Sequence, residues 1–426
     1  MDHTAIVTGW SCLVLTLATL ATLIGLHLNR RQQRAVMDHR NAVPHPFVEQ
    51  ISLAAHQKAA DYTHAKLAVD HREQLLSLAL LYAWTLGGGL ELLDHLLARW
   101  ALPLPWHGVL FLLLFFIIQQ LLELPLDLYR TFRVEARFGF NKMTLPLYCS
   151  DMFKQLLLMI LFGAPLAWVM LTLMQRAGAY WWLDAWLVWS AFSLLMIWLF
   201  PTWIAPLFNT FSPLPAGEMK TRIEALLARC GFESNGLFVM DGSRRSSHGN
   251  AYFTGLGRAK RIVFFDTLLK QLTPLEAEAV LAHELGHFHH GHVKKRIVVM
   301  LLASLLGFML LGWLTTTTWF YTGLGLSTPS PHAALALFML VLPVFTFILH
   351  PLMNYFSRQN EFEADAYAIA HSSGDALVSA LVKLYADNAS TLTPDPLYSA
   401  WHDSHPPASV RIRHIQDNPH VPARTA

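Results

Sequence analysis

Seven apolar stretches of helical length run through this sequence and limit its possible folds more than any other feature. They cover residues 5–28, 75–97, 106–128, 155–175, 180–206, 297–322 and 333–353. About 20 apolar residues cross a bilayer as a helix, so each stretch is long enough for one span. Only 14% of the residues are charged, against about 25% in an average soluble domain. We therefore expect a mainly α-helical integral membrane protein with seven transmembrane helices.

Basic residues between these stretches predict how the helices are oriented. The connections 29–74 and 129–154 carry seven and five Lys or Arg, whereas 98–105 and 176–179 carry one each and 323–332 carries none. Because short connections rich in Lys and Arg stay in the cytoplasm, we expect the N-terminus outside and the large polar regions inside. The first apolar run has its basic cluster after it, which indicates a retained span and not a signal peptide. The short connections favour a bacterial inner membrane over an endoplasmic-reticulum membrane.

The apolar stretches divide the chain into four parts. These are residues 1–206 with five spans, the polar region 207–296, residues 297–353 with two spans, and the polar region 354–426. The region 207–296 has the pattern of a small α+β domain. It has helical spacing at 218–230, apolar runs of strand type at 236–240 and 261–265, and a helix start near Pro274.

The string His-Glu-Leu-Gly-His at 283–287 carries the clearest chemical signal in the sequence. Thr-Pro-Leu-Glu at 273–276 predicts a capped helix start ahead of it. Residues four apart share one face of a helix, so His283 and His287 can bind one tetrahedral zinc ion. Glu284 lies beside them, where a carboxylate can take a proton from a water molecule that the metal activates. The pattern predicts a zinc hydrolase with Glu284 as its general base.

Two patterns can supply the third metal ligand. The metzincin pattern requires Gly and His three and six residues after the second histidine, but positions 290 and 293 are His and Val. The other source is a carboxylate on a later helix, where Glu361 and Asp365 share one face. We expect Glu361 to complete a His₂Glu site and Asp365 to orient one ligating imidazole by accepting its hydrogen bond. The competing carboxylate, Glu363, points to the opposite side of that helix.

The other imidazoles and the thiols are not expected to bind the metal. The histidines that follow the motif lack the spacing of a ligand and are expected at the membrane interface or beside the ligands; they are His289, His290 and His292. The cysteines are scattered without paired spacing, which excludes a thiolate site or a disulfide framework; they are Cys12, Cys149 and Cys230. A net charge of +2 gives no indication of a nucleic-acid partner.

Further short strings occur in order along most of the chain. They are Glu135 with Gly-Phe-Asn-Lys at 139–142, Pro-Leu-Phe-Asn at 206–209, Asp-Gly-Ser at 241–243, Ser-His-Gly-Asn-Ala-Tyr-Phe at 247–253, Phe-Asp-Thr-Leu at 265–268, Ser-Arg at 357–358, and His-Pro-Pro at 405–407 with Arg411. Each string alone is weak, but their order and number make the pattern specific. With the zinc motif, this pattern resembles the type I CAAX prenyl endopeptidases, the membrane branch of peptidase family forty-eight.

The resemblance implies a ring of seven transmembrane helices around a large chamber, closed at the cytoplasmic end by a zincin domain of the gluzincin type. It implies that Asn250, Ala251 and Tyr252 form a strand edge that pairs with the substrate backbone. It also implies that His405 and Arg411 stabilise the oxyanion of the tetrahedral intermediate.

We therefore expect a membrane zinc metalloendopeptidase with one Zn²⁺ per chain. It would cleave near the C-terminus of prenylated CAAX-type peptides or other membrane-associated peptides, with the substrate and the lipid bilayer as its partners. Two alternatives stay open. One is a quality-control protease that clears membrane proteins without a prenyl requirement. The other is a transporter or channel with a structural zinc, a kind of site that usually has four protein ligands.

Overall fold

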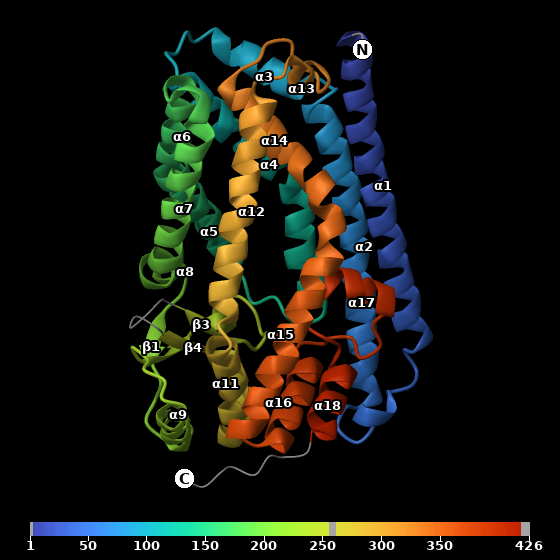
Figure 1. The fold of residues 1–426 in the computed structure, drawn as a ribbon. Coiled ribbons are helices and arrows are strands. Elements are labelled where there is room, and N and C mark those ends of the chain that lie inside the picture. The colour runs from blue at the N-terminus through green and yellow to red at the C-terminus, as the bar shows by residue number, and fades with distance from the viewer. Residues whose placement is uncertain (1–2, 255–260, 419–426) are drawn as a thin grey trace.

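Long helices stand side by side and carry a small mixed domain at one end (Figure 1). The computed structural model describes residues 3–254 and 261–418. Within these residues six helical segments are long and apolar enough to cross a membrane, or seven if one bent pair counts as a single span. The structure thus confirms the expected class, a mainly helical multi-pass membrane protein.

Each candidate span is one helix or a run of helices that continue one another. In chain order they are α1 (His3–Asp38), α2 (Leu53–Trp84) with α3 (Gly89–Ala98), α4 (Trp106–Tyr129) with η2 (Arg130–Glu135), α5 (Leu145–Leu158) with η3 (Met159–Gly163) and α6 (Ala164–Arg176), α7 (Trp181–Leu199) with η5 (Phe200–Ile204) and α8 (Ala205–Phe208), α12 (His292–Leu314), and α14 (Pro331–Thr346) with η8 (Phe347–Leu349) and α15 (His350–His371). Short helices η1 (His45–Phe47), η4 (Gly178–Tyr180) and α13 (Thr318–Thr322) lie in the connections.

The second span differs from the single straight helix expected over 75–97. Helices α2 and α3 are bent by 50° at their junction, and α3 lies across the end of the bundle (Figure 1). The junction contains three consecutive glycines, 87–89, and Gly88 has a φ of 76°. Gly88 is the residue just before α3, and glycine adopts this left-handed backbone at little steric cost, which lets the chain change direction there.

The sixth span also differs from the range expected, 297–322. Helix α12 begins earlier, at His292, and ends at Leu314. Four consecutive threonines follow, and the hydroxyls of the first three donate to carbonyl oxygens of the last helical turn at 2.7 to 2.9 Å. Side chains that bind the helix's own carbonyls compete with further helical pairing, so the helix stops although the sequence stays apolar.

A four-stranded sheet forms the centre of the mixed domain. Its strands are β1 (Phe211–Pro213), β2 (Leu237–Met240), β3 (Ala251–Thr254) and β4 (Arg261–Phe265), in the order β1-β2-β4-β3. Strands β2 and β4 run parallel, and the other two pairs are antiparallel. The strands expected at 236–240 and 261–265 are thus confirmed.

Six helices and one short turn complete this domain: η6 (Gly242–Arg244), α9 (Glu218–Arg229), α10 (Asp266–Gln271), α11 (Pro274–His289), α16 (Gly374–Asp387), α17 (Pro396–His402) and α18 (Ala408–Asp417). Its apolar core joins Ile223, Phe264 and Leu281 to Leu377 and Ile415. Two chain segments separated by membrane helices therefore fold around one core.

Two charge pairs, each with a buried carboxylate, connect the domain to the bundle. The Arg245 guanidinium donates to both carboxylate oxygens of Asp151 on α5, at 2.8 and 3.0 Å, and to Asn209 Oδ1 at 2.9 Å. On the other side, Arg31 of α1 donates to Asp395 through two nitrogens, at 2.9 and 3.2 Å. Bidentate pairs of this kind set orientation as well as distance. The domain is therefore held in register with both α1 and α5.

Candidate metal centre and cleft

Helix α11 carries the His-Glu-Leu-Gly-His motif and begins with the capping box expected from the sequence. The backbone N–H of Thr273 donates to Glu276 Oε2 at 2.7 Å, and the N–H of Glu276 donates to Thr273 Oγ1 at 3.3 Å. Glu276 also accepts from Ser379 Oγ at 2.7 Å and from Lys383 Nζ at 2.8 Å, both on α16. The start of the helix is thus tied to a neighbouring helix of the domain.

Gly286 brings α11 and α15 into close contact. A Cβ atom added at this glycine would lie 2.8 Å from Ala364 Cα and 3.0 Å from Ala364 O. Real Cβ contacts are not that short, so only glycine lets the two backbones approach to this distance. The flanking residues His283 and His287 therefore face the middle of α15, where Glu361 lies.

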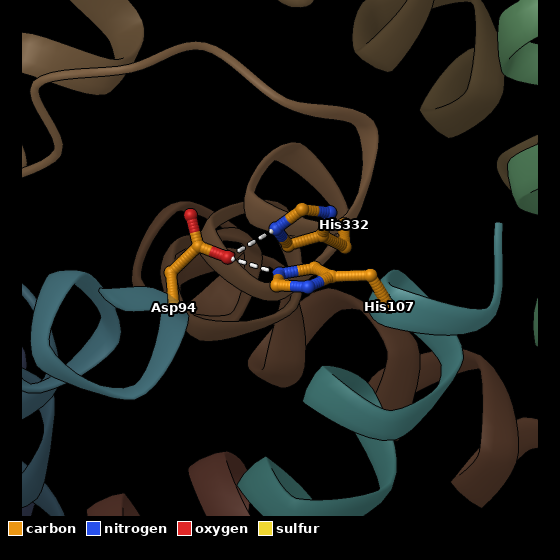
Figure 2. Close-up of side chains that lie close together, drawn as sticks. All are labelled: Asp94, His107 and His332. Carbon is orange, nitrogen blue, oxygen red and sulfur yellow. Dashed lines mark hydrogen bonds and ion pairs between the residues drawn. The ribbon is translucent and has the colours of Figure 1, made fainter. Parts of the chain in front are cut away.

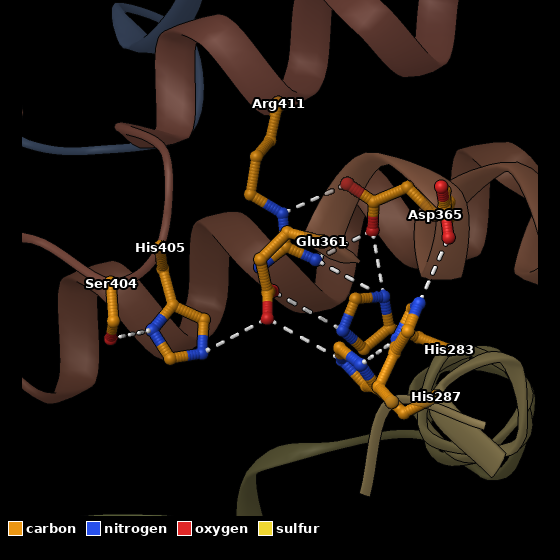
Figure 3. A network of polar contacts seen from close by, with 9 residues as sticks. His283, His287, Glu361, Asp365, Ser404, His405 and Arg411 are labelled. Carbon is orange, nitrogen blue, oxygen red and sulfur yellow. Dashed lines mark hydrogen bonds and ion pairs between the residues drawn. The ribbon is translucent and has the colours of Figure 1, made fainter. Parts of the chain in front are cut away.

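The imidazoles of His283 and His287 meet the carboxylate of Glu361 at the spacing of metal ligands (Figure 3). His283 Nε2 lies 3.4 Å from Glu361 Oε2, and His287 Nε2 lies 3.4 Å from Glu361 Oε1. Nitrogen and oxygen donors on one tetrahedral zinc are about 3.4 Å apart, given bond lengths of about 2.0 to 2.2 Å. Among the described atoms, Glu361 Oε2 is buried and has no hydrogen-bond partner. These donors fit a zinc ion.

The charge state of the two glutamates suits different tasks. Two imidazoles and the guanidinium of Arg411 surround the buried carboxylate of Glu361, and these partners stabilise its ionised form. Glu361 is therefore an ionised carboxylate that can serve as a ligand. Glu284 lines the same cleft, and burial raises its pKa, whereas a cation bound between the ligands would lower that pKa. A carboxylate with a raised pKa is a better proton acceptor.

Asp365 and Arg411 hold the first histidine from behind (Figure 3). Asp365 Oδ1 lies 2.8 Å from His283 Nδ1, so that nitrogen donates to the carboxylate and Nε2 keeps its lone pair. Arg411 donates to both oxygens of Asp365, at 2.6 and 2.9 Å. Its remaining nitrogen, Nη1, lies 3.4 Å from Glu361 Oε2. The buried guanidinium is thus engaged with Asp365 and Glu361, which is a different surrounding from that of a donor exposed to substrate.

A second chain of contacts holds the other histidine and places His292 beside a ligand, one of the two positions expected for it; the part that Glu363 plays was not expected. His287 Nδ1 lies 2.9 Å from His292 Nδ1, and His292 Nε2 lies 2.9 Å from Glu363 Oε2. Because the Glu363 carboxylate only accepts, His292 Nε2 donates to it and His292 Nδ1 accepts from His287 Nδ1. His287 Nε2 is then left with its lone pair toward the metal centre.

The turn between α11 and α12 makes this contact possible. Gly291 has a φ of 67°, a left-handed conformation that lets α11 end and places His292 at the start of the next helix. Glu363 does point away from Asp365, as expected, but that side of α15 faces His292. The glycine four residues after His287 is the one signal in the sequence that indicates such a turn.

This chain of contacts predicts an effect on metal affinity. Replacing His292 by Ala should weaken zinc binding by about 10- to 100-fold, because the orienting hydrogen bond to His287 is lost. Zinc transfer to a chromogenic chelator measures this. Since His292 is buried, the half-exposed Glu363→Ala serves as a second variant with a smaller expected effect. His289→Ala, an exposed neighbour on α11, is the matched control. Equal affinity in all four proteins would show that the contact does not support the ligand.

A cleft of about 380 Å³ opens over the ligands. Glu284, Asn250 and Ala251 line it together with His405 and Arg411. Strand β3 pairs on one side with β4 and, among the described strands, forms the edge of the sheet. A free strand edge beside a cleft can pair with an extended peptide. The hydroxyl of Tyr252 contacts Met240 Sδ at 3.9 Å, and Tyr252 itself is not among the residues that line the cleft.

His405 reaches the ligands from a loop. Its Nε2 lies 3.4 Å from Glu361 Oε1, its Nδ1 lies 3.0 Å from Ser404 Oγ, and 63% of its side chain is exposed (Figure 3). Arg358 steadies this loop by donating to the carbonyl oxygens of Ala400 at 3.3 Å and Asp403 at 2.8 Å. His405 is therefore a positioned donor that stays accessible from the cleft.

Comparison with known proteins places this geometry among peptidases. Residues 32–210 match a family model described as the CAAX prenyl protease N-terminal region with five membrane helices, and residues 213–418 match the model of peptidase family M48.

Individual relatives match over most of their length. A CAAX prenyl protease 1 homolog of Oryza sativa subsp. japonica is 39% identical over 312 residues, which cover 73% of both chains. The homolog of Caenorhabditis elegans is 32% identical over 420 residues, 92% of this chain and 93% of the relative. The crystal structure of S. mikatae Ste24p superposes with a TM-score of 0.89 at 31% identity, covering 95% of this chain and 98% of that one.

Proposed function

This chain belongs to the type I CAAX prenyl endopeptidases of peptidase family M48, and from this premise we propose that it uses one Zn²⁺ to cleave prenylated CAAX peptides at the membrane. The observation that carries the proposal is the spacing of 3.4 Å between Glu361 and each imidazole, with Glu284 in the same cleft. Family membership identifies the protein as a metallopeptidase, which decides against the transporter or channel alternative.

We assign His283, His287 and Glu361 as the zinc ligands. Bound there, zinc would supply Lewis acidity toward the scissile carbonyl and lower the pKa of the attacking water. Three protein ligands leave a position open for substrate or water, which is typical of catalytic and not of structural zinc.

Glu284 is proposed as the general base. Its carboxylate takes a proton from the attacking water and passes it to the leaving amine. The edge of β3, at Asn250, Ala251 and Tyr252, aligns the peptide by backbone hydrogen bonds so that the scissile bond lies over the ligands.

His405 and Arg411 have separate roles in this proposal. The accessible imidazole of His405 donates to the oxyanion as it forms. The guanidinium of Arg411 is committed to Asp365, which supports a positioning role through that carboxylate, with its charge close to Glu361. This differs from the direct contact with the oxyanion that the family resemblance implies for Arg411.

A cavity between the helices supports a substrate that carries a lipid. It measures about 640 Å³ and lies between α1, α2, α4 and α14. Aliphatic side chains from these helices line much of it, among them Leu80, Leu81 and Leu340, and it reaches Tyr398 and His402 of the catalytic domain. Polar side chains, among them Asp70, Glu73 and Gln119, line the rest of the cavity. Its aliphatic part can take up a hydrocarbon chain while the peptide enters the cleft.

We also propose that the metal centre faces the cytoplasm and that the N-terminus lies outside. The basic segments 29–74 and 129–154 supply Arg31 and Lys154 near the end of the bundle that carries the domain, which agrees with the positive-inside rule. The short connections between the helices keep a bacterial inner membrane as the proposed location. The relatives named above come from eukaryotes.

Matched peptides test the substrate proposal. The purified protein should cleave a farnesylated CAAX peptide faster than the same peptide without the farnesyl group, because the lipid contributes binding energy that the bare peptide lacks. Release of the C-terminal tripeptide, followed by mass spectrometry, measures both rates. Equal rates would contradict the prenyl requirement and favour general membrane proteolysis, the remaining alternative.

A further inference from the structure

Three side chains converge at the end of the bundle opposite the metal centre. Asp94 comes from α3, His107 from the first turn of α4, and His332 from the first turn of α14 (Figures 1 and 2). Helices α3 and α4 follow each other in the chain, whereas His332 lies 238 residues after Asp94. None of the three residues lines the catalytic cleft. The proposed peptidase mechanism uses none of them.

The ring nitrogens of both histidines point at one carboxylate oxygen (Figure 2). Asp94 Oδ1 lies 2.7 Å from His107 Nε2 and 2.9 Å from His332 Nε2. The His332 side chain is 5% exposed, that of His107 is 12% exposed, and that of Asp94 is 21% exposed. The group is therefore shielded from solvent but can be reached from one side, through the carboxylate.

The two imidazoles are arranged much like the ligand pair of the metal centre. Their ring centroids are 5.1 Å apart, compared with 5.0 Å between His283 and His287. Both present Nε2, and one potential ligand atom from each of the three residues lies within 4.8 Å of the others. What differs is the carboxylate, which lies closer to the nitrogens here than Glu361 does in the metal centre.

We propose that Asp94, His107 and His332 bind a second divalent transition metal of the zinc type. Two imidazoles and one carboxylate are ligands that such ions accept. Metal ligation would require the carboxylate to withdraw from the nitrogens by about 0.5 to 0.7 Å to reach the usual spacing of donors. Asp94 is the most exposed of the three and can make this adjustment without moving the buried ring of His332.

Ser330 lies beside this group and offers a further ligand atom. Ser330 Oγ lies 3.1 Å from His332 Nε2 and also caps the start of α14 by accepting from the N–H of Ala333 at 3.3 Å. This hydroxyl, or a water held by it, lies near the position that three protein ligands leave open. A bound ion would join α3, α4 and α14 at the end of the bundle where the bent α2–α3 pair closes over the helices.

Metal stoichiometry tests this proposal without reference to peptidase activity. The full chain in detergent is loaded with Zn²⁺, freed of excess ion, and analysed by mass spectrometry. We expect about two zinc equivalents per chain in the unchanged protein and about one in His332→Ala. Asp94→Asn, which keeps the shape of the side chain, should also hold one equivalent. His95→Ala is the matched control, because His95 is an exposed histidine next to Asp94 and should leave the count at two.

The two sites can be separated by a variant of the other centre. Glu361→Ala should retain the equivalent bound at Asp94, and Glu361→Ala combined with His332→Ala should retain none. The proposal would be overturned if the unchanged protein held one zinc equivalent, His332→Ala kept that equivalent and Glu361→Ala lost it. The three residues would then be a hydrogen-bonded junction between helices. Loss of an equivalent in His95→Ala would likewise overturn it, by revealing adventitious binding to surface histidines.

Discussion

Replacing Glu284 by Gln should lower the rate of peptide cleavage by about 10²- to 10⁴-fold while the protein keeps its zinc, because the change removes the proton acceptor and preserves the shape of the side chain. His283, His287 and Glu361 stay in place, so the metal site itself is unaltered. The rate is measured as tripeptide release from a farnesylated peptide at saturating concentration, and zinc content is measured on the same preparation.

A second glutamate on the same helix provides the control. Glu278 is buried and pairs with Arg229 at 2.6 Å and Arg222 at 3.3 Å, away from the cleft. Glu278→Gln makes the same chemical change on α11 and should leave kcat unaltered. If Glu284→Gln cleaved at the rate of the unchanged protein, Glu284 would not be the base. If it also lost its zinc, the lower rate would reflect a damaged metal site.

Replacing Glu361 by Ala should remove one zinc equivalent per chain and abolish activity. The change leaves two neutral imidazoles, a weaker set of ligands than two imidazoles with a carboxylate. It also leaves Arg411 without one of the two carboxylates near its buried guanidinium. Metal analysis and the cleavage assay together measure both losses. The variant should lose its peptidase activity together with one zinc equivalent relative to the unchanged protein.

The matched control for this variant lies two residues further along α15. Glu363→Gln changes a carboxylate that contacts His292 instead of the metal centre, and the amide can still accept the hydrogen bond from His292. It should retain the zinc equivalent. Unchanged zinc content in Glu361→Ala would contradict the assignment of Glu361 as a ligand and direct attention to His405, which lies 3.4 Å from the same carboxylate.

Local spacing explains how much of this molecule could be predicted from its sequence. Apolar length predicts the spans, and two histidines four residues apart must share a helical face. Features that depend on backbone conformation could not be predicted from the sequence. The break at Gly88 and the end of α12 after Leu314 both lie within apolar runs, and such runs predict a continuous helix. The hydropathy of a residue does not indicate whether a glycine is left-handed or whether a threonine hydroxyl donates to a carbonyl oxygen of its own helix.

Contacts between distant segments were also beyond the sequence alone. The link from His287 through His292 to Glu363 depends on the turn at Gly291 and on how closely α11 packs against α15. Asp94 and His332 come from segments that share no motif. The expected roles of His405 and Arg411 came only from the family resemblance, because neither a loop histidine nor a single arginine has a distinctive spacing.

The order of the chain has a consequence for how the enzyme is made. The helix with His283 and His287 is synthesised first, and α12 and α14 follow before Glu361 emerges on α15. Since α14, η8 and α15 run on as one segment of 41 residues, both α12 and α14 must be synthesised before Glu361 can reach the histidines. The two segments of the catalytic domain are thus separated in the chain by α12 and α14, and no continuous piece of the sequence contains both segments without these helices. The proposed set of three zinc ligands can therefore be complete only in a chain whose helices α12 and α14 have already been synthesised.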